Sequence, residues 1–212
     1  MTAALHIRPY RAASKAIAML ALCFVAALQP HPLAAQEASD NDKLGMAVEY
    51  FQSGKYHEAL LLFRDLNGRY RLNPRLEAYM GVCCYYEWEF EEACAHIDSV
   101  ADRLEVLAPQ ERSVYYYCSA ESHFALGRYD EAAQWFERML LVCHDNEKGD
   151  ALYRIGFCHV QRQQWALAKE YLESALAYYT RFGGVNDKPG RVPQIRNMIV
   201  GCDEKIKNGV TQ

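Results

Sequence analysis

The 212-residue sequence predicts an all-α solenoid of about four helix-turn-helix repeats, followed by a capping helix. Three observations support this fold class. Four alanines recur at intervals of 34, 39 and 36 residues, the residue types around them recur with them, and an amphipathic stripe follows the last copy. The alanines are Ala59, Ala93, Ala132 and Ala168.

Each of these alanines has the same kinds of neighbour. Twelve positions earlier lies a small residue, which lets two antiparallel helices approach closely: Ala47, Gly81, Ala120 and Gly156. Three positions earlier lies an aromatic residue: Tyr56, Phe90, Tyr129 and Trp165. Four positions later lies a large apolar residue: Phe63, Ile97, Phe136 and Leu172.

This pattern, over about Asn41 to Arg181, resembles the tetratricopeptide repeat family. The resemblance implies two-helix repeats stacked side by side, with a protein or peptide bound on the concave face. The sequence departs from the pattern at two turns. Trp88 and Gln163 stand where the first and third copies have glycine.

Residues 1–35 have the features of a secretory signal peptide. Arg8, Arg11 and Lys15 precede the uncharged run 16–28, and small residues end the segment at Ala35. The run is shorter than the roughly 20 residues that a membrane-spanning helix needs. We therefore expect cleavage near Ala35 and export to the periplasm or the cell exterior. An uncleaved N-terminal anchor is the alternative.

The charge balance argues against two classes of partner. The whole chain has 23 basic and 27 acidic residues. Residues 1–35 contain three of the basic residues and none of the acidic ones, which leaves 20 against 27, a net charge of −7. Nucleic acid and anionic lipid bind through lysine and arginine. We therefore expect no nucleic-acid partner and no binding to anionic lipid. No membrane span is expected once the signal peptide is removed.

The four repeats are expected within residues 36–181, at about 41–73, 74–108, 111–145 and 149–181. The expected helix pairs are 40–53 with 56–68, 74–88 with 91–107, 111–125 with 129–142, and 150–161 with 166–179. The second helix of repeat two is expected to continue to Leu107, because Val100, Leu104 and Leu107 keep helical spacing.

A loop, a helix and a polar tail are expected after the repeats. Residues 182–190 are rich in glycine, asparagine and proline, which is typical of a loop. Residues 191–207 place one apolar stripe on a helix, and 208–212 form the tail. The end of a solenoid exposes an apolar flank, so this helix is interpreted as its cap.

The resemblance also implies a binding groove along the first helix of each repeat. Matching its positions to the four alanines gives a surface that is mostly apolar and aromatic: Val48, Phe51, Val82, Tyr85, Tyr86, Tyr117, Glu121, Phe124, Tyr153 and Phe157. No lysine or asparagine stands at these positions, so a protein or peptide partner with apolar or aromatic side chains is favoured. The alternative is that the aromatic residues pack between repeats.

The cysteines and histidines support a competing hypothesis, an accessory redox or metal-binding protein. Seven cysteines follow the signal peptide, without a C-x-x-C motif, and buried free thiols are the expected state. His123, His159 and Cys158 could be imagined as zinc ligands, although their spacing matches no known zinc motif. No cofactor is predicted.

Catalytic motifs are missing from the sequence. It contains no G-x-S-x-G, no H-E-x-x-H and no glycine-rich nucleotide loop. The acidic pairs Glu91-Glu92 and Asp130-Glu131 begin helices, where carboxylates favour the helix dipole. The leading prediction is a non-enzymatic scaffold that binds protein outside the cytoplasm.

Overall fold

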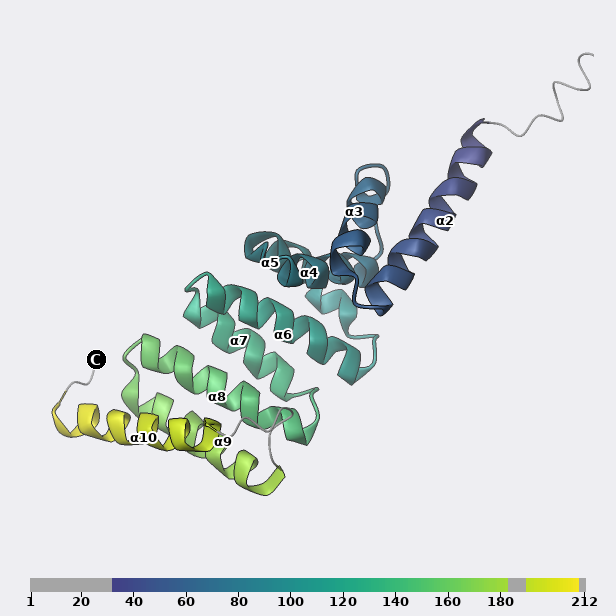
Figure 1. The fold of residues 1–212 in the computed structure, drawn as a ribbon. Coiled ribbons are helices and arrows are strands. Elements are labelled where there is room, and N and C mark those ends of the chain that lie inside the picture. The colour runs from purple at the N-terminus through teal and green to yellow at the C-terminus, as the bar shows by residue number, and fades with distance from the viewer. Residues whose placement is uncertain (1–31, 183–189, 210–212) are drawn as a thin grey trace, which may run out of the picture. The chain divides into compact units, whose positions relative to one another are not determined.

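The computed structural model describes residues 32–182 and 190–209 (Figure 1). Almost all of the expected signal peptide, most of the expected loop and the end of the tail lie outside these residues. The chain divides into two compact parts, Met1–Lys43 and Leu44–Gln212. In the described residues of the first part, the amide of Gln36 donates to the carboxylate of Asp40 at 3.2 Å, and Lys43 lies 3.9 Å from the same carboxylate.

The described chain is built of helices, which confirms the predicted all-α solenoid with a capping helix. The helix pairs are α2 (Pro32–Gln52) with α3 (Tyr56–Asn67), α4 (Pro74–Tyr86) with α5 (Phe90–Asp98), α6 (Pro109–Ala125) with α7 (Tyr129–Leu140), and α8 (Asp145–Gln161) with α9 (Trp165–Phe182). The final helix, α10 (Arg191–Lys207), packs on α9. Helices α6, α7 and α8 lie side by side in Figure 1.

The recurring residues form the contacts within each helix pair. All four repeat alanines are fully buried, and so are the large apolar residues four positions after them. Gly81 shows why a small residue is needed at the crossing. A Cβ at this position would lie 2.4 Å from Cγ1 of Ile97 and 3.1 Å from the carbonyl oxygen of Ala93. Helices α4 and α5 can therefore approach this closely only without a side chain here.

The four turns within the repeats share one backbone geometry, including the two without glycine. The second residue after the first helix has a positive φ in every repeat: 75° at Gly54, 66° at Trp88, 71° at Gly127 and 60° at Gln163. The next amide donates to a carbonyl five residues back, as from Gln164 to His159 at 2.9 Å. This is the hydrogen bond of a Schellman turn. Trp88 and Gln163 therefore adopt the conformation that glycine favours.

The predicted extension of the second helix in repeat two is wrong. Helix α5 ends at Asp98, and the 3₁₀ helix η1 (Ala101–Leu104) follows. The hydroxyl of Ser99 donates to the carbonyl of His96 at 2.9 Å and helps to end the helix. Val100 and Leu104 are still buried, against Tyr115 of α6. Their apolar spacing therefore reflects burial, which a 3₁₀ turn satisfies as well as a continued helix.

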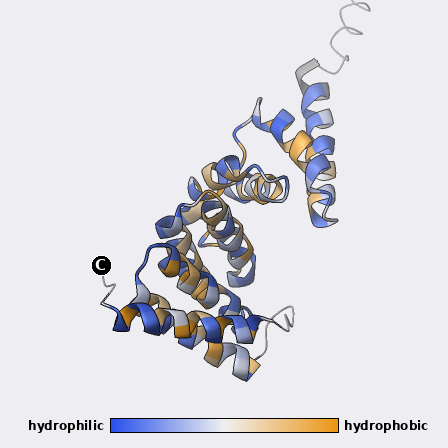
Figure 2. Cartoon of the chain, turned by 60° about the vertical axis from the view of Figure 1, so that its left-hand side comes forward, coloured by the Kyte–Doolittle hydropathy of each residue, from blue (hydrophilic) through white to orange (hydrophobic). Residues whose placement is uncertain are grey.

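Helix α10 covers the apolar flank of α9. Ile195 and Cys202 are buried in one cluster with Leu172 and Ala175 of α9. In Figure 2 hydrophobic bands alternate with hydrophilic ones along α10, as expected of a helix with one buried face. None of the helices in the part of the chain that the structure describes combines the length and apolar character needed to cross a membrane.

Candidate functional site

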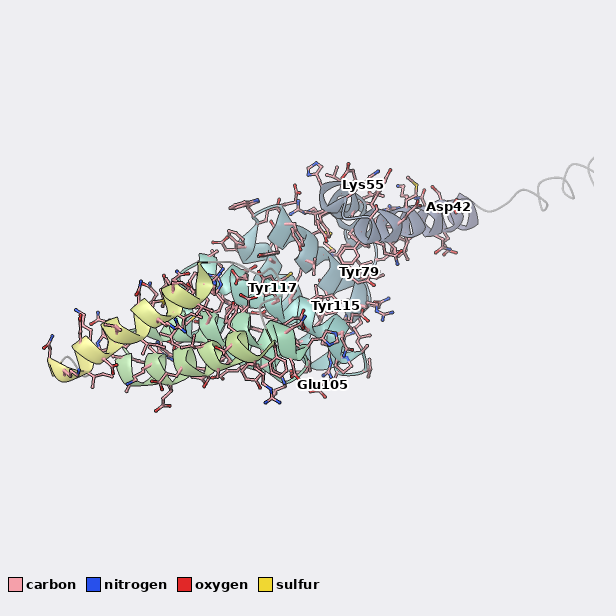
Figure 3. The ribbon with its side chains drawn as sticks, turned by 60° about the horizontal axis from the view of Figure 1, so that its bottom comes forward. Asp42, Lys55, Tyr79, Glu105, Tyr115 and Tyr117 are labelled. Carbon is pink, nitrogen blue, oxygen red and sulfur yellow. The ribbon has the colours of Figure 1, made fainter. Side chains whose placement is uncertain are left out.

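The first helices of repeats two to four carry a hollow, here called the central cleft, with a volume of about 250 Å³. Residues from α4, α6, α8 and α10 line it, among them Tyr86, Tyr117, Glu121, Tyr153, Arg154 and Arg191. Tyr117 lies in the middle of the helical stack in Figure 3, close to Tyr115. The central cleft therefore brings together residues far apart in the sequence.

A second hollow adjoins the central cleft and is here called the aromatic shelf. It has a volume of about 290 Å³, and its main lining residues are Tyr85, Tyr86, Trp88, Phe90 and Phe124. Tyr86 and Glu121 line both hollows. The two therefore form one continuous surface across repeats two to four.

Ring stacking holds the aromatic residues of this surface in place. The rings of Tyr86 and Tyr56 are stacked 4.0 Å apart, and Tyr85 meets Tyr117 edge-on at 6.1 Å. Burial raises the pKa of the Tyr85 and Tyr117 phenols, and the neighbouring tyrosine and Glu121 add to the rise at Tyr85. Tyr86 nevertheless remains 47% exposed. It is a fixed aromatic ring that a partner can reach.

The central cleft also contains charged groups. Arg154 binds the carboxylate of Glu121 through two nitrogens, at 2.6 and 2.7 Å, and its guanidinium lies 4.7 Å from the ring centre of Phe124. Arg191 lies 3.9 Å from the ring centre of Tyr153. Stacked guanidinium groups keep hydrogen-bond donors free at their edges. The surface therefore combines aromatic faces with arginine donors.

The repeat pattern alone does not reveal these arginines, and the groove predicted from it is apolar and aromatic. Arg154 follows Tyr153 directly, and its direction into the cleft depends on the pairing with Glu121 of the neighbouring repeat. Arg191 comes from α10, outside the four aligned repeats. The carboxylates of Glu147 and Asp150 also line the cleft. The spacing of residues in the sequence therefore does not predict which charged side chains line the cleft.

Six of the ten predicted groove residues line the two hollows: Tyr85, Tyr86, Tyr117, Glu121, Phe124 and Tyr153. Phe157 lines neither hollow, but its ring lies 5.5 Å from that of Phe124.

The other three predicted groove residues line neither hollow. Val82 is only 1% exposed, in a cluster with Ile97, so it is a packing residue. Phe51 stacks on Tyr79 at 4.0 Å, and Val48 packs against the cluster that contains Ala59. Repeat one and the inward side of α4 therefore use these side chains for packing within and between repeats.

The imagined zinc ligands do not form a ligand group in the described residues. Nε2 of His123 lies 2.8 Å from the carboxylate of Asp98, whereas Nδ1 of His159 lies 2.7 Å from the amide oxygen of Gln164. All seven cysteines in the described chain are free, and six of them are buried. Burial raises the pKa of Cys158 to about 12, which makes its thiolate scarce at neutral pH.

The fold and the surface define a helical-repeat scaffold of the kind that binds other proteins. A family comparison agrees: residues 150–180, which contain most of α8 and α9, match the tetratricopeptide repeat model. The resemblance to this family is thereby confirmed. A comparison with curated proteins finds no match.

Solved structures of MamA, a tetratricopeptide-repeat protein, share the fold. A MamA mutant is 13% identical with a TM-score of 0.59, and the match covers 81% of this chain and 90% of that chain. MamA 41-end from Desulfovibrio magneticus RS-1 is 14% identical with a TM-score of 0.52, over 80% of this chain and 96% of that chain. MamA MSR-1 C2 is 13% identical with a TM-score of 0.52, over 79% and 98%. Similarity at this level establishes the fold alone.

Proposed function

We propose that this chain is a non-enzymatic adaptor that holds a segment of another protein in the central cleft and on the aromatic shelf. A scaffold for protein–protein interaction is the function that the tetratricopeptide fold supports. One observation carries the proposal of this particular surface. The exposed, stacked ring of Tyr86 lines both hollows, and it shares the central cleft with Arg154 and Arg191.

The chemistry of the surface suits a segment with two kinds of group. The aromatic shelf offers ring faces to an apolar or aromatic side chain, the type of residue that anchors many interfaces. The central cleft offers Arg191, and the N–H groups of Arg154 that do not bind Glu121, to carbonyl oxygens of the same segment. A partner with an apolar anchor next to polar oxygen groups is therefore the one we propose.

We also propose that the protein acts outside the cytoplasm. The basic start, the short uncharged run and the small residues near Ala35 support this location. The mass of the protein purified from its own organism tests it. A mature chain that begins near Gln36 is expected, and a chain that retains Met1 to Ala35 would contradict export by cleavage.

Affinity capture with matched variants tests the binding surface. The wild-type chain is compared with the triple variant Tyr86→Ala, Phe124→Ala and Phe157→Ala, using an envelope extract of its own organism. The control is Val106→Ala with Leu141→Ala, because these side chains are 89% and 85% exposed and line neither hollow. We expect the wild type and the control to capture the same protein, and the triple variant not to capture it. Equal capture by all three would contradict the assignment.

A further inference from the structure

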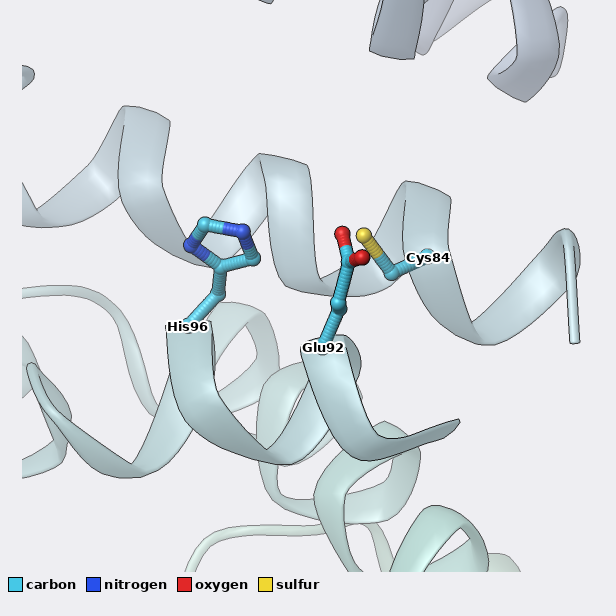
Figure 4. A group of neighbouring side chains, drawn as sticks. All are labelled: Cys84, Glu92 and His96. Atoms are coloured by element: carbon cyan, nitrogen blue, oxygen red, sulfur yellow. The ribbon is translucent and has the colours of Figure 1, made fainter. Parts of the chain in front are cut away.

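A thiol, a carboxylate and an imidazole meet between α4 and α5, among residues that line neither the central cleft nor the aromatic shelf. Cys84 comes from α4, and Glu92 and His96 come from α5 (Figure 4). One ligand atom of each lies within 4.8 Å of the other two. We propose that these three residues bind a divalent metal ion of the zinc type.

The three side chains match the chemistry of zinc. Zinc in proteins takes thiolate sulfur, imidazole nitrogen and carboxylate oxygen in tetrahedral arrangements. In such a site the ligand atoms lie roughly 3.3 to 3.8 Å apart, given metal–ligand bonds of about 2.0 to 2.3 Å. Glu92 and His96 are one helical turn apart and share a face of α5. Glu92 is exposed, so its side chain can rotate and bring a carboxylate oxygen closer to the sulfur of Cys84 and the nitrogen of His96.

A second carboxylate orients the imidazole. Nδ1 of His96 lies 3.0 Å from an oxygen of Glu77, and the side chains of both residues are about 20% exposed. When Nδ1–H donates to this carboxylate, Nε2 carries the free lone pair. Histidines that bind metals are held by such a carboxylate in many proteins. The pair therefore presents His96 as a ligand through Nε2.

Negative charge surrounds the proposed site. Glu77, Glu89 and Glu92 lie there, and Arg64 binds both Glu89 and Glu92. A metal ion would compete with Arg64 for Glu92, and Arg64 would keep Glu89. Binding of a metal ion to the sulfur of Cys84 releases the thiol proton.

Cobalt titration of the reduced full chain tests the proposal, because Co²⁺ occupies zinc sites and gives a thiolate charge-transfer band. We expect this band at one equivalent of Co²⁺, and its loss when Zn²⁺ is added. The variants Cys84→Ser and Cys84→Ala should lose the band. The matched control is Cys94→Ser, because Cys94 is also a buried thiol of this helix pair.

Zinc competition against a chromophoric chelator measures the other ligands. Glu92→Gln and His96→Gln should each weaken binding at least tenfold, and Glu77→Gln about tenfold through the orientation of His96. Arg64→Gln should tighten binding, because it removes the competing cation. Circular dichroism checks that each variant remains helical. If the wild type gives no band, or if Glu92→Gln and His96→Gln bind zinc as tightly as the wild type, the proposal is wrong.

Discussion

At the scale of single residues, helix contact distance decides which side chains the repeats tolerate. Gly81 and Gly156 lie where α4 meets α5 and where α8 meets α9. A Cβ at Gly156 would lie 2.8 Å from Cγ of Leu172, which is fully buried. Small residues are therefore a geometric requirement of the fold, independent of what the protein binds.

The substitution Gly81→Ala should lower the free energy of unfolding by about 1–3 kcal/mol, because the new methyl group overpacks the contact with Ile97. Urea unfolding measures this change. Gly201→Ala is the control: a Cβ added to this helical glycine would meet nothing within 4 Å, so alanine should gain up to about 1 kcal/mol there. Equal stability of Gly81→Ala and wild type would contradict a tight crossing of α4 and α5.

At the scale of elements, turns and caps decide how the helices are joined and where the solenoid stops. Gln163 has the left-handed conformation that Gly127 has in the preceding repeat. This conformation costs a residue with a Cβ about 1 kcal/mol or more. The turn geometry is therefore imposed by the packing of α8 against α9, although the local sequence opposes it.

Gln163→Gly should raise the free energy of unfolding by about 1 kcal/mol, because it relieves the left-handed backbone. Gly127→Ala should lower it by a similar amount for the opposite reason. Thermal or urea unfolding of both variants measures the pair. The same sign of change in both would contradict a shared turn geometry.

Helix α10 should contribute to stability through its buried face. Ile195→Ala should cost about 2–5 kcal/mol, since Ile195 is fully buried against α9. Val200→Ala is the control on the same helix, because Val200 is 55% exposed and should change stability by less than about 0.5 kcal/mol. A small effect of both substitutions would mean that α10 does not stabilise the array.

At the scale of the whole molecule, buried cysteine thiols make the stability of the fold fall at alkaline pH. Burial raises the pKa of Cys83, Cys94 and Cys158 from 9.0 to about 12. In the unfolded chain these thiols lose their protons near the ordinary value. Their contribution to stability is therefore complete below about pH 9 and is lost as the pH rises towards 12.

The urea midpoint of the reduced protein should accordingly be lower at about pH 10.5 than at about pH 8. Cys158→Ala should show a smaller fall between the same two conditions, because one buried thiol no longer contributes. Denaturation followed by circular dichroism at both pH values measures the difference. A midpoint that does not change with pH would contradict the burial of the thiols.

The sequence predicted the architecture because the residues of the contact between the two helices of a repeat recur at matching positions in all four repeats. The four alanines and their small partners identified the helix crossings without any knowledge of distance. The end of α5 at Asp98 was not predictable from apolar spacing. Val100 precedes the 3₁₀ helix and Leu104 lies within it, and both are buried, as they would be in a continued α-helix. Tertiary packing overrode periodicity there.

The candidate site was only partly predictable for a related reason. Tyr86 and Tyr117 follow the repeat register, so the alignment of the repeats found them. Arg191 lies outside the repeats, and Arg154 enters the cleft through an ion pair with another repeat. The cluster of Cys84, Glu92 and His96 likewise depends on which faces of α4 and α5 meet. Contacts between helices decide all of these, and they have no fixed spacing in the sequence.

Site-specific photo-crosslinking in the protein's own organism tests the central claim, that the central cleft and aromatic shelf bind a protein partner. A photoreactive phenylalanine analogue replaces Tyr86 or Tyr117 in the surface, and Val106 outside it as the control. We expect one crosslinked partner from positions 86 and 117, and none from position 106. Crosslinking from position 106 alone, or equally from all three positions, would contradict the claim.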